Sequence, residues 1–94
     1  MKKVTLENNE YTLIENYKDG FDLEALTERY TSYFEEYDYI LGDWAYGKLR
    51  LKGFCKKDNK LFKSINDYEL IKKYIKENCA YDCRYFILEK HTSK

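Results

Sequence analysis

The sequence predicts an α+β domain in which an antiparallel sheet carries two helices on one face. Three patterns predict this fold class. Apolar and polar residues alternate on both sides of an Asn pair near the N-terminus, apolar residues recur at helical spacing in two later segments, and a nearly continuous apolar run lies near the C-terminus.

The first part of the chain predicts a hairpin followed by a helix. Alternation over residues 4–13 surrounds Asn8 and Asn9, which tolerate positive φ and so favour a tight turn between two strands. Asp22 is well placed to cap a helix, and the helical spacing of the apolar residues after it predicts a helix that ends near Glu36.

A second hairpin is expected next. Residues 39–41 predict a short apolar strand, residues 42–47 predict a glycine-flanked loop, and residues 48–55 alternate charged with aliphatic side chains, as in a half-buried strand. Residues 56–63 are polar and predict a loop.

The last elements are a helix and a strand. Ser64 or Asn66 can cap a helix that ends near Asn78, and residues 84–88 predict a final strand. Because the apolar run of this strand is nearly continuous, we expect it to be central in the sheet.

The predicted order is therefore β-β-α-β-β-α-β, in one domain of residues 1–90 followed by a frayed tail at residues 91–94. Without its extra N-terminal strand, this order is the ferredoxin-like, split βαβ arrangement, in which two helices cover one face of the sheet. We expect the other face to be open or partly covered by the N-terminal hairpin.

Composition gives no argument for a membrane or a highly charged partner. The 94 residues contain 17 basic and 17 acidic side chains, so only local clusters of charge can attract nucleic acid or another ligand. The N-terminus lacks the apolar run of a signal peptide, and the three cysteines are an odd number. We expect a cytoplasmic protein with reduced thiols.

A cationic stripe lies on the strand at residues 48–55. Period-2 alternation places Lys48, Arg50, Lys52 and Phe54 on one face, which we expect to point outward. In the βαββαβ order this strand occupies the position where RNA-recognition domains carry a K/R-G-F/Y segment, and residues 52–54 match its first three positions but not the next two. The stripe is interpreted as a solvated or protein-facing surface, or as a site for RNA or single-stranded nucleic acid.

The loop at residues 42–47 offers a second candidate binding feature. It can present Trp44 and Tyr46 together as anchors for a protein partner, or Trp44 can fold back onto the core. Asp43 lies beside Trp44 and close to the cationic strand, where a small charged site can form.

The cysteines and the single histidine permit, but do not require, a metal site. Cys79 and Cys83 have a C-x3-C spacing, and with Cys55 and His91 they supply four possible zinc ligands. A redox pair and buried, inert thiols are the alternatives. The chain shows no catalytic constellation and no cofactor motif, so it is predicted to bind a partner and not to be an enzyme.

Three segments resemble the YutD-like family of small cytosolic proteins from Gram-positive bacteria: YKDGF at residues 17–21, YDYILGDWAYGKLRLKGF at 37–54 and CAYDCRYFILEK at 79–90. The resemblance implies an α+β fold and no known reaction, so it assigns no catalytic residues. The segment shared with the family includes Asp43, Tyr46, Arg50 and Lys52, which the core does not explain.

The sequence therefore predicts a binding or regulatory module whose partner is a protein, with RNA as the alternative. The predicted contact surface extends from Asp43 to Phe54 and uses seven side chains: Asp43, Trp44, Tyr46, Lys48, Arg50, Lys52 and Phe54.

Overall fold

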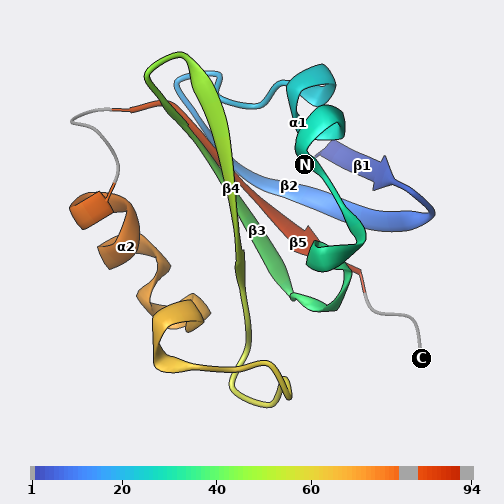
Figure 1. The fold of residues 1–94 in the computed structure, drawn as a ribbon, viewed down its shortest axis with the longest axis vertical. Coiled ribbons are helices and arrows are strands. Elements are labelled where there is room, and N and C mark those ends of the chain that lie inside the picture. The colour runs from blue at the N-terminus through green and yellow to red at the C-terminus, as the bar shows by residue number, and fades with distance from the viewer. Residues whose placement is uncertain (1, 79–82, 92–94) are drawn as a thin grey trace.

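A five-stranded antiparallel sheet forms the centre of the computed structural model, which describes residues 2–78 and 83–91 (Figure 1). Its strand order is β1-β2-β5-β3-β4. The strands are β1 (Lys2–Leu6), β2 (Asn9–Tyr17), β3 (Tyr39–Ala45), β4 (Lys48–Phe54) and β5 (Tyr85–Lys90). The α-helices are α1 (Leu23–Arg29) and α2 (Ile71–Asn78), and short 3-10 helices occupy η1 (Ser32–Glu36), η2 (Ser64–Asn66) and η3 (Tyr68–Leu70). The protein thus has the α+β fold that the sequence predicts.

Both hairpins close through two-residue turns with positive φ at both central positions, which is the type I′ geometry that matches the twist of paired strands. The first turn is Glu7 and Asn8, with φ of 48° and 75°, one residue earlier than the expected Asn pair. The second is Tyr46 and Gly47, with φ of 54° and 75°. The expected six-residue loop is therefore wrong, because β3 continues through Trp44.

The first helical segment is shorter than its apolar spacing predicts. The Asp22 carboxylate accepts a hydrogen bond from the N–H of Ala25, as expected of a cap, but α1 ends at Arg29. Tyr30 is extended, and the Thr31 hydroxyl caps the separate turn η1. The second segment begins with η2 and η3, and α2 is described as far as Asn78, near which the sequence predicts its end.

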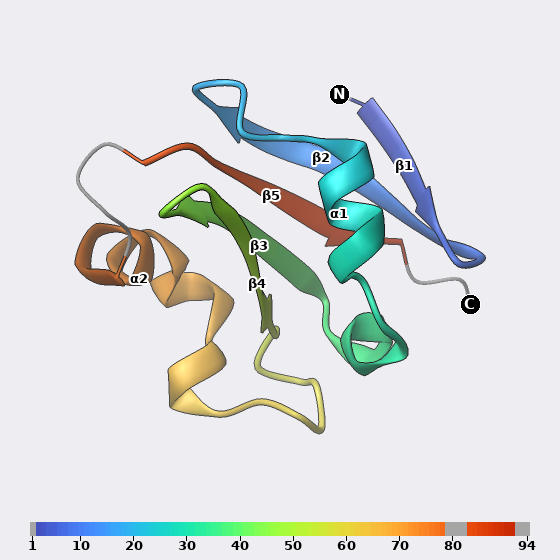
Figure 2. The ribbon, with the colours of Figure 1, turned by 45° about the horizontal axis from the view of Figure 1, so that its top comes forward.

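The two α-helices lie on opposite faces of the sheet, so the expectation that both cover one face is wrong (Figures 1 and 2). Ile40 and Phe86 pack with Leu26 of α1, whereas the neighbouring Leu41 and Ile87 pack with Ile71 of α2. We call these the α1 face and the α2 face. Because β3 and β5 are apolar on both sides, each face needs a cover. The N-terminal hairpin extends the sheet sideways and covers neither face.

β5 occupies the middle of the sheet, as its apolar run predicts. Phe86, Ile87 and Leu88 are buried there between the two layers. No helix in the described part of the chain has the length and apolar character needed to cross a bilayer.

Close packing between β3 and β5 leads to a stability prediction. A Cβ on Gly42 would lie 2.2 Å from Cζ of the buried Phe86 ring. Gly42→Ala should therefore lower the free energy of unfolding by about 3 kcal/mol in urea titrations, through overpacking. The control is Gly47→Ala, where no atom lies within 4 Å but φ is +75°, so only backbone strain of about 1 kcal/mol is expected. A smaller loss for Gly42→Ala than for Gly47→Ala would contradict this account.

Candidate functional site

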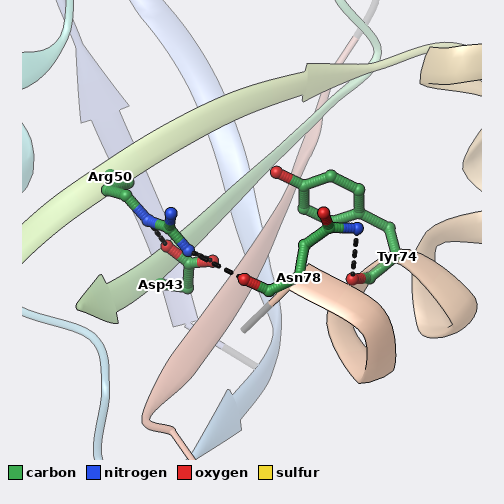
Figure 3. A network of polar contacts seen from close by, with 4 residues as sticks. All are labelled: Asp43, Arg50, Tyr74 and Asn78. Carbon is green, nitrogen blue, oxygen red and sulfur yellow. Dashed lines mark hydrogen bonds and ion pairs between the residues drawn. The ribbon is translucent and has the colours of Figure 1, made fainter. Parts of the chain in front are cut away.

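An ion pair joins the two strands of the second hairpin to α2 (Figure 3). The register places Asp43 of β3 opposite Arg50 of β4. The Arg50 guanidinium donates to both carboxylate oxygens, at 2.9 Å and 3.0 Å, and also to the carbonyl of Asn78 at 3.3 Å. Asn78 is the last described residue of α2, and a cation near the C-terminal end of a helix interacts favourably with the helix dipole. The side chain of Asp43 is 4% exposed and that of Arg50 is 49% exposed, so the buried carboxylate depends on the arginine.

The cationic face of β4 is not an open platform. Lys48, Arg50, Lys52 and Phe54 do share one face, as the alternation predicts, but this is the α2 face. Phe54 is 1% exposed, and the ring of Tyr74 from α2 packs edge-on against it at 5.5 Å between centroids. The expectation that Phe54 points outward is therefore wrong, and its ring is not available for stacking on a base.

Lys52 lies at the margin of this covered face. Its Nζ is 5.2 Å from the centroid of Phe54 and 5.3 Å from that of Tyr74, so the ammonium interacts with both rings. Lys48 is the first residue of β4 and is exposed.

Trp44 and Tyr46 are not presented together. Trp44 packs on the α1 face, where its indole N–H donates to the carbonyl of Gly20 at 2.7 Å and the Arg84 guanidinium lies 4.7 Å from its ring. Of the two placements that the sequence allowed for Trp44, the structure has the one against the core. Tyr46 is fully exposed at the tip of the turn.

A groove runs beside β4, the strand at one edge of the sheet. We call it the β4 groove; it has a volume of about 380 Å³ and is lined by Tyr33, Tyr37, Leu51, Lys52, Gly53, Lys60, Leu61, Lys63, Ile65 and Asn66. The lining contains three lysines and no acidic residue. The groove thus combines an apolar lining with positive charge.

Two smaller hollows continue this surface. One of about 220 Å³ surrounds the Asp43–Arg50 pair and shares Leu51 and Lys52 with the β4 groove. Another of about 240 Å³ extends along α2 and shares Ile65. The surface around β4 is therefore continuous from the ion pair to the start of α2.

Tyr33 and Tyr37 form one wall of the β4 groove. Their hydroxyls are hydrogen-bonded at 3.0 Å, and this bond, with partial burial, raises the pKa of Tyr37 to about 12. A Cβ on Gly53 would lie 2.4 Å from the Tyr37 ring, so glycine is what allows the ring to lie against β4. Tyr33 is 66% exposed.

The opposite wall is a loop held in place by polar contacts. The Asp38 carboxylate accepts hydrogen bonds from the N–H of Lys56 at 2.8 Å and from Asn59 at 3.1 Å. The buried Asn66 side chain accepts from the N–H of Lys63 and donates to the carbonyl of Leu61. These contacts fix the loop while leaving Ile65 70% exposed.

Sequence reasoning missed the groove walls. The apolar spacing placed Tyr33 within a helix that ends near Glu36, and residues 56–63 were interpreted only as a polar loop. The spacing of the three groove lysines gave no periodic signal, because Lys52 lies on a strand whereas Lys60 and Lys63 lie on the loop.

The candidate metal ligands are not gathered in the described part of the chain, which contains no cluster of three or more potential ligands. Cys55 follows Phe54, which pairs with Tyr39 at one end of β3, whereas Cys83 precedes Tyr85, which pairs with Asp43 near the other end. Four residues of strand separate these positions by about 14 Å.

The remaining candidates differ in surroundings. Cys55 is buried, and this burial raises the pKa of its thiol. His91 donates its backbone N–H to Glu10 at 2.9 Å, and its ring contacts Thr12. Cys79 lies outside the described residues.

Comparison with known proteins gives consistent matches over nearly the whole chain. A family model described as "YutD-like: Putative antitoxin YutD-like" matches residues 5–89. "Putative antitoxin YutD" of Bacillus subtilis (strain 168) is 41% identical over 87 residues, which are 93% of this chain and 96% of that protein. The solution NMR structure of yutD from B. subtilis aligns with a TM-score of 0.81 and 39% identity, over 99% of this chain and 84% of that one.

The ion pair predicts an asymmetric loss of stability. Arg50→Met leaves the buried Asp43 carboxylate without its cation and should cost about 3 kcal/mol in the free energy of unfolding. Asp43→Asn leaves an arginine that can turn toward solvent and should cost about 1 kcal/mol. Lys48→Met, an exposed cation on the same strand, is the control and should change stability by less than about 0.5 kcal/mol. Equal losses for Arg50→Met and Asp43→Asn would refute the dependence of the carboxylate on the arginine.

Proposed function

Because the chain belongs to the YutD-like family, whose model is described as a putative antitoxin, we propose that it is a non-enzymatic binding module that neutralises a protein partner by holding it on the surface around β4. The observation that carries the proposal is the β4 groove, which joins exposed apolar side chains to lysines without an acidic residue in its lining. An antitoxin of this kind acts by occupying its target, so it needs an interaction surface and no catalytic group.

The apolar part of the surface has the character of an interface core. Tyr33, Ile65 and Leu70 are 66%, 70% and 46% exposed, although each has a large apolar side chain. Exposed apolar side chains that gather on one surface favour a protein contact, and a few such anchors supply most of the binding energy of an interface. Ile65 lines both the groove and the hollow along α2, which places it centrally.

Nucleic acid is the weaker candidate. RNA binding through the β4 face requires an exposed ring and free cations, but Phe54 is covered by Tyr74 and Arg50 is paired with Asp43. Of the groove lysines, Lys60 pairs with Glu36 at 3.5 Å, whereas Lys52 and Lys63 can face either class of partner. The exposed apolar anchors favour a protein, because they have no counterpart in a phosphate backbone.

Depletion in host cells tests the proposal. Cells in which the chain is made from a regulated promoter should stop growing when it is depleted, and wild-type chain should restore growth. The Tyr33→Ala/Ile65→Asp double variant should fail to restore growth, because losing two anchors at about 2 kcal/mol each weakens partner binding by hundreds of fold.

The matched control is Leu23→Asp, which changes an apolar residue that is 48% exposed on α1. It should restore growth like the wild type, and both variants should keep the wild-type unfolding midpoint. Growth that continues during depletion would refute the antitoxin role, and equal rescue by both variants would refute the surface around β4.

A further inference from the structure

The outer edge of β4 carries backbone groups that the sheet does not use. The two-residue turn makes Ala45 and Lys48 a hydrogen-bonded pair, and the bonding alternates from there. Arg50 therefore bonds to β3, whereas the N–H and C=O groups of Leu49, Leu51 and Gly53 point away from it.

Three hydrogen bonds support this assignment independently. The N–H of Trp44, which lies opposite Leu49, donates to the carbonyl of Arg84 at 3.1 Å and thus points away from β4. Cys55, the next residue of the outward series, uses both its N–H and its C=O to bond Asn66 and Tyr68. One end of the edge is therefore already paired with a neighbouring segment. In the described part of the chain no other segment bonds the outward backbone groups before it, where Leu51 is half-buried and Leu49 and Gly53 are buried.

The half-buried Leu51, in the middle of this part of the edge, lines the β4 groove. Leu51 and Gly53 contribute to the floor of the groove, and the distance from Leu49 to Gly53 is about 14 Å in a strand. The other edge of the sheet, β1, offers only Lys3 and Thr5 in the outward series, and the hollow beside it has a volume of about 80 Å³. The hollow available to an extended chain is therefore larger along β4 than along β1, although Lys3 and Thr5 are exposed.

The charges around the groove argue against a second copy of this chain. In an antiparallel β4–β4 pair centred on Leu51, Arg50 of each copy would lie opposite Lys52 of the other, and like charges in that position are destabilising. Basic residues on an edge strand are a common protection against self-association. The same charges attract an acidic segment.

We infer that the occupant of the β4 groove is an extended acidic segment of a protein partner, which adds to β4 as a sixth, antiparallel strand. The inference rests on the proposed function and specifies the partner. A strand added in this way gains main-chain hydrogen bonds from the open edge and takes its specificity from alternate side chains.

The two faces of β4 specify the pattern of the partner strand. Its side chains on the α2 face lie beside Lys48 and Lys52, and acidic residues complement these lysines. Its side chains on the α1 face lie beside Leu51 and Tyr33, and apolar residues fit there. The partner segment should therefore alternate acidic and apolar residues.

A labelled peptide tests this inference with the full chain. The probe is the seven-residue peptide Glu-Val-Glu-Val-Glu-Val-Glu, with N-methyl groups on the Glu amides to prevent self-assembly, and its binding is measured by fluorescence anisotropy. Leu51→Pro removes an outward N–H without removing a bond to β3 and should weaken binding at least about tenfold. Thr5→Pro makes the same change on the β1 edge and should leave the affinity within about twofold.

Peptide variants keep the test valid if Leu51→Pro does not fold. In an antiparallel strand the Val amides face β4, so moving the N-methyl groups to the Val amides should abolish binding by the wild-type chain. A peptide with Lys in place of Glu should not bind, and neither should a labelled single-stranded oligouridine of ten nucleotides.

Any result that differs from these expectations would overturn the inference. Affinity that is insensitive to Leu51→Pro and to the position of the N-methyl groups excludes strand addition, and equal binding of the Lys peptide or tighter binding of the RNA excludes an acidic segment. If the peptide experiments contradict strand addition but the Tyr33→Ala/Ile65→Asp variant still fails to restore growth, the proposed function stands and only strand addition is wrong. If that variant rescues growth, the proposed function itself is wrong.

Discussion

The two-residue turn at Tyr46 and Gly47 sets the register on which the candidate site depends. Because the turn makes Ala45 opposite Lys48 a bonded pair, it also places Asp43 opposite Arg50. The same alternation leaves the backbone groups of every second residue of β4 pointing away from the sheet. A slip of one residue would move Arg50 to the other face and separate it from the buried carboxylate. One turn thus determines both the ion pair and the open edge.

The position of α2 then decides which part of β4 is available to a partner. The helix covers Phe54 through Tyr74, and its last carbonyl accepts a hydrogen bond from Arg50. This cover removes the strand face as a binding platform and leaves the edge and its flanking walls. The candidate site is therefore the groove beside β4 and not the covered face of the strand, and Tyr33 and Ile65 are exposed at this groove.

Sequence patterns predicted the features that depend on neighbouring residues. The alternation of β4 and the Asp22 cap follow from local spacing, and the apolar run of β5 indicates its central place. The short second turn was missed because Tyr46 has positive φ, which is uncommon for a residue other than glycine.

The faces of the helices and the walls of the groove depend on long-range contacts. Residues 39–41 are buried on both sides of the sheet, and a continuous apolar strand does not indicate which side a given helix covers. The groove joins Tyr33 to Ile65 across more than thirty residues of chain, and polar contacts of Asp38 and Asn66 hold the loop that forms its second wall. No periodic pattern within either segment predicts that Tyr33 and Ile65 lie at the same groove.

Amide hydrogen exchange of the free protein, followed residue by residue by NMR, tests the central claim most directly. If β4 has an open edge, the amide of the half-buried Leu51 should exchange at least about tenfold faster than those of Arg50 and Lys52, which bond to β3. Uniform protection along β4, or the opposite alternation, would show that the edge is closed and would contradict the account.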